Sequence, residues 1–202
     1  MWVKICGVRT VDQALWAQSC GADAVGVNLV PSSPRCVSPE VAADIADALA
    51  IETVLVVMDV SEEVLGELVT TTRANLVQLH GDERPGFGAW LGVHTYKAHR
   101  ARPGVLTEIT EHGGDRFLLD AHVPGQAGGT GRLVDLELAA AASKLGRLVL
   151  AGGLHAGNVA QAIERVRPWG VDVASGVESH RGRQDPARVE AFVRAARGAD
   201  SR

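Results

Sequence analysis

Residues 148–176 read LVLAGGLHAGNVAQAIERVRPWGVDVASG, in which two short apolar runs, each followed by glycine, enclose a longer amphipathic stretch. Short apolar runs bounded by glycine predict strands, and the stretch between them has the length and patterning of a helix. A strand, a helix and a second strand in this order are typical of a βαβ unit in a parallel sheet. The same alternation extends over almost the whole chain.

Eight short apolar runs along the chain predict strands, at residues 2–6, 24–29, 53–58, 76–80, 94–98, 117–120, 148–151 and 171–174. Helix-start signals lie between them, namely Thr10 with Gln13 as a capping box, Ser61 as an N-cap, and the pairs Ser38-Pro39 and Asp185-Pro186. Eight such units form either a doubly wound sheet or a closed barrel, and periodicity does not separate the two. A barrel of this length needs short loops, because such barrels typically have about 250 residues.

The composition is that of an ordinary globular protein, with 46% hydrophobic and 22% charged residues. A formal net charge of −4 argues against a nucleic-acid partner, because such proteins usually carry a basic surplus. No apolar stretch approaches the ~20 residues of a membrane span, so we expect no membrane partner. Three cysteines without a C-x-x-C pair favour a reducing compartment, and we expect a cytoplasmic protein. Since no linker divides the chain, we expect one domain over residues 1–202, with 198–202 as a flexible tail.

Glycine and polar residues gather where the predicted strands end, which is where a parallel α/β protein places its active site. Glycine lets backbone N–H groups approach an anion closely, although turns also use glycine for steric reasons alone. A phosphate site after strands seven and eight recurs in eightfold barrels. Three successive groups favour such a site here: Gly128 to Gly131, with Gly129 and Gly131 as candidates, then Gly152 and Gly153, then Ser175 and Gly176.

Two side chains at strand ends, Cys6 and Asp120, are suited to form an acid–base pair. A thiol facing a site acts as a base or nucleophile when its pKa is lowered, whereas a free cysteine elsewhere is usually a small buried hydrophobe. Asp120 follows an apolar run, where desolvation would raise its pKa toward that of a general acid; the alternative is an aspartate that caps a loop. An acid and a base on opposite sides of one pocket are expected of a proton-transfer isomerase. For Cys20 and Cys36 we expect packing roles only.

Arg35 and His80 are further candidates, after the second and fourth predicted strands. The planar fork of Arg35 suits a substrate carboxylate, although a lone loop arginine is often a solvated charge. His80 either lines the site or is a structural histidine. The seven histidines are scattered, with no H-x-x-x-H pair, so we expect no metal.

Ordered sequence blocks over nearly the whole chain carry a resemblance to a known family. They are KICG at 4–7, GADA at 21–24 leading to SPR at 33–35, QLHGDE at 78–83, LLD at 118–120, GGTG at 128–131, LAGGL at 150–154 with NV at 158–159, and VDVASGVE at 171–178. Together they resemble the phosphoribosylanthranilate isomerase family of tryptophan biosynthesis. The resemblance implies a single (β/α)8 TIM barrel with short loops.

The resemblance also implies a reaction, the Amadori rearrangement of N-(5-phosphoribosyl)anthranilate to 1-(2-carboxyphenylamino)-1-deoxyribulose 5-phosphate. It makes Asp120 the general acid that protonates the furanose ring oxygen and Cys6 the general base that removes the C2′ proton. Arg35 then meets the anthranilate carboxylate, the glycine loops hold the phosphate, and Lys4 and His80 also bind substrate. The substrate's own nitrogen is the electron sink, so no cofactor is implied. We expect a small phosphorylated substrate and a monomer or homodimer.

The chain departs from the family's pattern at several positions, mostly by loss of aromatic residues. Asn28 places an amide where the family is apolar, and Val134 and Leu136 replace two aromatic residues after the sixth strand. These changes leave open a modified aryl-amine phosphoriboside as the substrate. Another phosphosugar isomerase or epimerase is the second alternative, although no duplicated half-barrel or metal-binding set is seen. A non-catalytic barrel that binds a phosphate metabolite is the third, and it would not need an acid–base pair.

Overall fold

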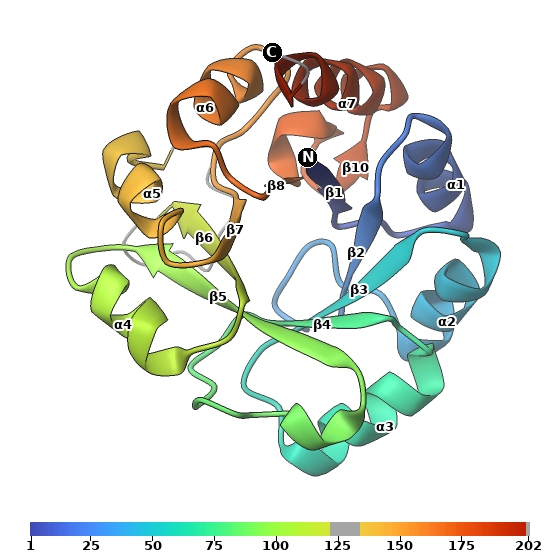
Figure 1. Ribbon diagram of the computed structural model, residues 1–202. Helices are drawn as coiled ribbons and strands as arrows, with labels where there is room; N and C mark the ends of the chain where they lie inside the picture. Colours follow the sequence, from blue (N-terminus) through green and yellow to red (C-terminus); the bar gives the residue numbers. More distant parts are fainter. Residues whose placement is uncertain (122–133, 201–202) are drawn as a thin grey trace.

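The computed structural model describes residues 1–121 and 134–200, and its centre is a closed barrel of eight parallel strands. The strands are β1 (Trp2–Cys6), β2 (Ala24–Asn28), β3 (Glu52–Val57), β4 (Leu76–Leu79), β5 (His94–Ala101), β6 (Arg116–Ala121), β7 (Arg147–Leu150) and β8 (Gly170–Val173). The helices are α1 (Val11–Ser19), α2 (Pro39–Ala48), α3 (Glu62–Thr72), α4 (Val105–His112), α5 (Leu136–Ala142), α6 (Val159–Val166) and α7 (Pro186–Asp200). They form a ring outside the strands (Figure 1).

Pairing between the first and last strands closes the barrel. Lys4 of β1 lies opposite Ala24 of β2 on one side and opposite Asp172 of β8 on the other. The strand order is therefore sequential all the way round, which confirms the (β/α)8 TIM barrel and excludes the doubly wound sheet. All eight predicted strands are present, with ends shifted by a few residues at most.

The predicted helix starts are capped by the expected side chains. Thr10 accepts a hydrogen bond from the Gln13 backbone N–H, and Ser38 and Ser61 accept equivalent bonds at the starts of α2 and α3. The Gln13 side chain reaches back to the N–H of Arg9 rather than to Thr10 itself, so the box is one residue wider than predicted. Asp185 accepts from two N–H groups in the first turn of α7.

The connection after β4 is the exception to the pattern of one α-helix after each strand. Only the short 3₁₀ helix η1 (Ala89–Leu91) lies between β4 and β5. Its flanking residues Gly86, Gly88 and Gly92 all have positive φ, a backbone conformation that interrupts a regular helix. This segment therefore crosses to β5 as a series of turns.

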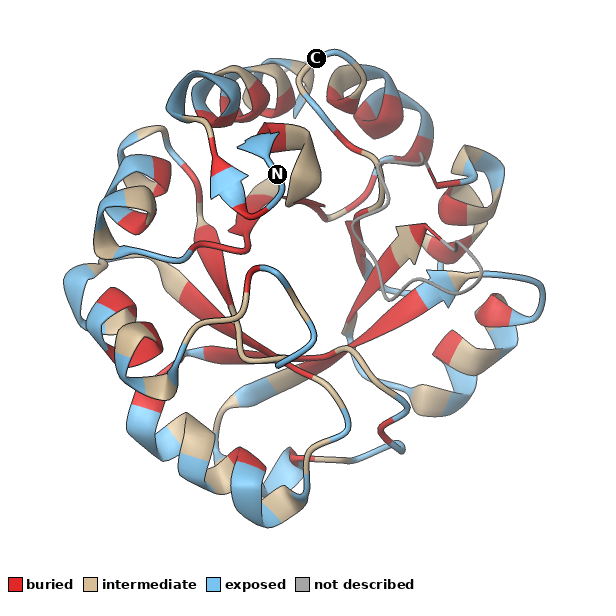
Figure 2. Cartoon of the chain, turned by 180° about the vertical axis from the view of Figure 1, so that it is seen from behind, coloured by how far each residue is buried: buried red, intermediate tan, exposed pale blue. Residues whose placement is uncertain are grey.

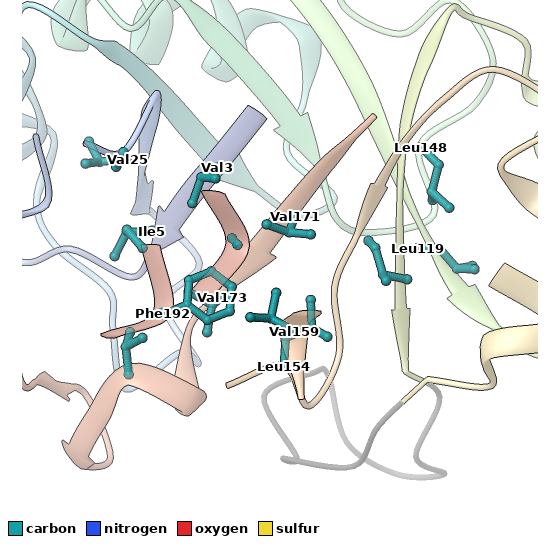
Figure 3. Packing of buried hydrophobic residues seen from close by; sticks show 14 of the residues in the cluster. Val3, Ile5, Val25, Leu119, Leu148, Leu154, Val159, Val171, Val173 and Phe192 are labelled. Atoms are coloured by element: carbon teal, nitrogen blue, oxygen red, sulfur yellow. The ribbon is translucent and has the colours of Figure 1, made fainter. Parts of the chain in front are cut away.

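Two apolar layers follow from the alternation of side chains along the strands. One set of alternate residues packs between the strands and the helices, as with Val3, Ile5, Val171 and Val173 against Phe192 of α7 (Figure 3). The other set fills the inside of the barrel and includes Ala24, Val54, Leu76, Tyr96, Leu118 and Val149. The strands are accordingly buried along most of their length (Figure 2).

An aromatic and cationic cluster closes the barrel at the end where the strands begin. The rings of Trp2 and Trp169 are stacked with centroids 5.3 Å apart. The guanidinium of Arg116 lies 4.4 Å from the Trp169 ring and 5.3 Å from that of Trp2. We call these three residues the floor cluster.

The chain between β8 and α7 contains a small hairpin that the sequence analysis did not predict. Its strands are β9 (Glu178–His180) and β10 (Arg183–Gln184), after the 3₁₀ helix η2 (Ser175–Val177). Helix α7 runs to Asp200, so residues 198–200 of the expected tail are helical, and 201–202 lie outside the described residues. The Asp200 carboxylate accepts a hydrogen bond from the amino terminus at 2.5 Å. Among the described residues, no helix is long and apolar enough to span a membrane.

Candidate active site

A cavity of about 650 Å³ opens at the end of the barrel where the strands finish. Seven of the predicted site residues line it: Cys6, Arg35, His80, Asp120, Gly152, Gly153 and Ser175. They come from strands or loops all round the barrel, so the closure of the sheet brings them together. The left-handed backbone at Gly152, with φ of +84°, turns the chain at the end of β7 into this cavity, and a side chain there would collide with Ala121.

Two other predicted residues, Lys4 and Gly176, do not line this cavity, and two more are not described by the structure. Lys4 is fully buried below it, and Gly176 lines an adjoining cavity that shares Ser175. Gly129 and Gly131 lie outside the described residues.

Cys6 is the last residue of β1, and its thiol is almost completely buried at the cavity wall. Burial raises the pKa of this thiol, while the nearby Lys4 ammonium and, more weakly, the Arg35 guanidinium lower it. Its backbone carbonyl accepts a hydrogen bond from the Gln184 side chain at 3.1 Å. Cys6 is therefore held between β1 and the hairpin, with cations on two sides.

Asp120 lies near the end of β6, across the cavity mouth from β1. Burial, and then the negative charge of Asp172, raise the pKa of Asp120 to about 6. One of its carboxylate oxygens accepts from the Ala121 N–H at 2.8 Å, which is the local bond expected of a capping aspartate. This bond coexists with exposure to the cavity, so the carboxyl is held in place and able to donate a proton near neutral pH.

Asp172 is a site residue that the sequence analysis did not single out. It lies on β8, lines the cavity, and forms a 3.0 Å ion pair with the buried ammonium of Lys4. Burial raises the pKa of Asp172, and the Lys4 ammonium opposes that effect. The available signal was an acidic residue between Val171 and Val173, because a charge inside an otherwise apolar strand needs a buried partner.

His80 is held in one neutral form by its neighbours. Gln78 accepts from the Lys4 ammonium and the Tyr96 hydroxyl through Oε1, so its amide nitrogen is the donor to His80 Nδ1 at 2.9 Å. The proton of the neutral ring is then on Nε2. Burial, with the nearby Lys4, Lys97 and Arg100 charges, lowers the pKa of His80 to about 4. His80 thus brings an uncharged N–H donor to the cavity lining.

Arg35 is bound by a partner that the sequence analysis did not identify. Its Nε and Nη2 donate to the two carboxylate oxygens of Glu178 at 2.6 and 2.9 Å, and both side chains are buried. Such a two-point contact fixes the plane of the guanidinium. Nη1 is the part that Glu178 does not engage, and Arg35 still lines the cavity. The hairpin that carries Glu178 therefore orients Arg35.

The remaining wall of the cavity is largely apolar, with Val56, Met58 and Leu118 beside Asn28. Asn28 Oδ1 accepts a hydrogen bond from the Val30 N–H at 2.8 Å, so this amide shapes the loop after β2. Val134 and Leu136 do not line the cavity; Val134 is buried in the outer apolar layer and Leu136 packs against it. Among the described residues, no group of three or more histidine, cysteine, aspartate or glutamate side chains is arranged to hold a metal ion.

The sequence matches known proteins over almost its whole length. Residues 3–195 match the family model described as N-(5'phosphoribosyl)anthranilate (PRA) isomerase. The N-(5'-phosphoribosyl)anthranilate isomerase of Geobacter sulfurreducens is 43% identical over 97% of this chain and 98% of its own length.

Solved structures agree with the sequence match. Monomers of the dimeric phosphoribosylanthranilate isomerase of Thermotoga maritima superpose with a TM-score of 0.89 at 32% identity, covering 98% of this chain and 99% of that one. A phosphoribosyl anthranilate isomerase in complex with reduced 1-(o-carboxyphenylamino)-1-deoxyribulose 5-phosphate superposes with a TM-score of 0.84 at the same identity and coverage. With its barrel, its cavity and these matches, the chain belongs to the N-(5'-phosphoribosyl)anthranilate isomerase family.

Proposed function

We propose that this chain isomerises N-(5'-phosphoribosyl)anthranilate to 1-(2-carboxyphenylamino)-1-deoxyribulose 5-phosphate, with Asp120 as general acid and Cys6 as general base. These two roles are supported by the presence of Asp120 and Cys6 in one cavity. A carboxyl whose pKa is raised to about 6 and a thiol beside a buried ammonium line the same cavity, on β6 and β1. The reaction is an aldose–ketose isomerisation in tryptophan biosynthesis.

The reaction begins with one proton donation by Asp120 and one proton removal by Cys6, and a tautomerisation completes it. Asp120 donates its proton to the furanose ring oxygen; the C1′–O bond breaks as the anthranilate nitrogen forms a double bond to C1′. The Cys6 thiolate then takes the C2′ proton, and the electrons of that bond move toward the nitrogen to give an enolamine. The enolamine gains a proton at C1′ and loses one from the C2′ hydroxyl, which leaves the ketone. The substrate's nitrogen serves as the electron sink throughout.

The active protonation state is a minor one in the free enzyme. With a pKa of about 6, Asp120 is protonated in only about a tenth of molecules at pH 7. Burial also keeps most of Cys6 in the thiol form near neutral pH. Catalysis needs the protonated acid and the ionised base together, so any group that stabilises the thiolate raises the active fraction.

The substrate's two anionic groups fit opposite parts of the cavity. The Gly152–Gly153 turn and Ser175 support a phosphate site, which we extend to Gly176, Gly129 and Gly131. Arg35 Nη1 and the neutral His80 ring are donors for the anthranilate carboxylate. The apolar residues Val56, Met58 and Leu118 would contact the aromatic ring.

We take unmodified phosphoribosylanthranilate as the substrate, because the Asn28 amide oxygen is used within its own loop. Residues 1–202 are proposed to form one barrel domain. The three unpaired cysteines support a location in the cytoplasm. Both a monomer and a homodimer are proposed, because a solved relative is described as monomers of a dimeric enzyme. Light scattering on the purified protein distinguishes them.

The reaction is tested with freshly generated phosphoribosylanthranilate, whose fluorescence is lost on isomerisation. We expect turnover by the wild type and a fall of about 10²-fold or more in Cys6→Ser and in Asp120→Asn. Cys20→Ser, a substitution of a partly exposed thiol outside the cavity, is the matched control and should retain activity. A folded but inactive wild type would refute the proposed substrate.

A further inference from the structure

Lys4 has no role in the reaction as written, yet it is a fully buried lysine inside the barrel. Its ammonium is fully buried inside the barrel, where it donates to Asp172 Oδ1 at 3.0 Å and to Gln78 Oε1 at 2.9 Å. Burying an ion pair carries a desolvation penalty that the attraction between the partners often does not repay, and apolar residues of the same size often stabilise as well or better. Stability alone therefore gives no reason for a lysine at this position.

The geometry of the neighbouring strand shows what the ammonium lies next to. Gly26 of β2 pairs with Cys6 of β1, and both face the barrel interior with Lys4. A Cβ atom on Gly26 would lie 2.8 Å from Cys6 Sγ and 3.1 Å from Lys4 Nζ. Cys6 Sγ and Lys4 Nζ therefore both lie next to the space that a side chain at Gly26 would occupy. The neighbouring Lys4 ammonium lowers the pKa of the thiol.

We propose that Lys4 is a positioning residue for the base, with its ammonium held by Asp172 and Gln78 beside Cys6 Sγ so that the thiolate forms in a buried site. The proposal rests on the role of Cys6 as base in the proposed function. It replaces the expectation that Lys4 binds substrate, because Lys4 is fully buried and is not among the residues that line the cavity.

Three charged groups act on the Cys6 thiol, and they do so in different directions. Lys4 and the Arg35 guanidinium stabilise the thiolate, whereas the Asp172 carboxylate on β8 destabilises it. Asp172 has a second effect, because it also holds Lys4 in its charged form. The two effects of Asp172 on the thiol oppose each other, whereas Lys4 acts in one direction only. Removing Lys4 should therefore raise the pH at which Cys6 ionises, which removing a merely structural ion pair would not do.

The test measures Cys6 ionisation directly rather than through activity. In a background carrying Cys20→Ser and Cys36→Ser, the rate of Cys6 alkylation by iodoacetamide is followed from pH 6 to 11 by mass spectrometry. Lys4→Met should shift the midpoint upward by about one unit or more, which is about a tenfold loss of thiolate at pH 8. Lys4→Gln, which also removes the charge, should shift it in the same direction. The kcat lost in Lys4→Met should recover as the pH rises.

The matched control is Lys97→Met. Lys97 is also a buried lysine in a barrel strand, paired with Glu83 at 3.4 Å, but it contacts the carbonyls of Leu79, Gly81 and Ala98 rather than Cys6. It should leave the midpoint unchanged. Circular dichroism checks the folding of each variant. Lys4→Gln, which keeps a polar side chain for Asp172 and Gln78, tests the proposal if Lys4→Met does not fold.

An unchanged midpoint in folded Lys4→Met, or in folded Lys4→Gln, would overturn the proposal. Failure of the proposed function gives a different result, since Cys6→Ser would then retain isomerase activity whatever Lys4 does to the thiol.

Discussion

The two ends of the barrel interior differ in their side chains, although β1 and β6 contribute to both ends. At the floor, Trp2 and Trp169 stack on each other and the Arg116 guanidinium lies over their rings. At the mouth, Cys6, Asp120 and Asp172 are ionisable groups whose pKa values are all raised, first of all by burial. Between the two ends lies a middle level at which Lys4 and Gln78 are hydrogen-bonded.

This difference indicates that the floor cluster stabilises the folded chain, whereas the buried charges at the mouth destabilise it. The floor cluster combines aromatic contact with cation–π attraction, which stabilises the folded chain even though Arg116 Nε and Nη1 have no hydrogen-bond partner. The mouth keeps charges in a poorly solvated cavity, which destabilises the folded chain but sets the proton affinities that the reaction needs. Substitutions at the mouth should therefore lower activity without lowering stability. Substitutions in the floor cluster should lower stability and leave activity nearly unchanged.

The largest separation of activity from stability is expected for Asp120→Asn. Because the folded-state pKa of Asp120 is raised to about 6, ionisation of this group opposes folding as the pH rises from about 4 through 6. Asn has no charge to bury. The variant should lose about 10²-fold or more in kcat/KM while gaining up to about 3 kcal/mol in free energy of unfolding at pH 7. Urea titrations at pH 7 and pH 4 measure this; the gain should vanish at pH 4, and a loss of stability at pH 7 would contradict the account.

The floor should show the reverse pattern in Trp169→Ala. Loss of the ring removes the stacking on Trp2 and the closest cation–π contact of Arg116. We expect a destabilisation of about 2–4 kcal/mol in urea unfolding, with kcat/KM changed less than about threefold below the transition. Arg147→Ala is the matched control, since its guanidinium lies farther from the same ring, at 5.9 Å, and is half exposed. A tenfold loss of kcat in folded Trp169→Ala would show that the two ends are coupled.

A smaller effect at the mouth is expected from Glu178→Gln, which weakens the two-point contact that orients Arg35. If Arg35 binds the substrate carboxylate, KM should rise about tenfold while kcat changes little, since the contact is present in both the ground and the transition state. The exposed pair of Arg73 and Asp47 offers the control Asp47→Asn, which should have no effect. A fall in kcat at constant KM would instead give Arg35 a role in the chemical step.

The smallest effect is expected for Asn28→Val. The substitution removes the hydrogen bond from the Val30 N–H to Asn28 Oδ1, which should make the loop after β2 less ordered. We expect kcat/KM for phosphoribosylanthranilate to fall less than about threefold. Steady-state kinetics on this substrate measure the change. A loss of more than tenfold would mean that the amide contacts the substrate, and a substituted aryl amine would then be the better substrate to assay.

The outer layer of the fold was predictable from the sequence because it depends on local patterns. Short apolar runs predicted all eight strands, and Ser38, Ser61 and Asp185 marked helix starts correctly. The β9–β10 hairpin was missed, because its strands are short and polar and have no alternation to detect.

The partners inside the site were not predictable in the same way. Cys6, Asp120 and Arg35 could be selected as single residues at strand ends. The ion pairs within the site could not be predicted, because their members lie far apart in the sequence. Lys4 and Asp172 are 168 residues apart, and Arg35 and Glu178 are 143 residues apart. Both pairs form only when β8 closes the barrel against β1.

The most direct test of the acid–base assignment is the pH dependence of the ratio of kcat/KM in the wild type to that in Asp120→Asn. Ionisation of Cys6 and of the substrate affects both enzymes alike, so the ratio follows the protonated fraction of Asp120. The account predicts a constant ratio below pH 6 and a fall of about tenfold per pH unit above it. A ratio independent of pH between 5 and 9 would contradict the assignment of Asp120 as the general acid.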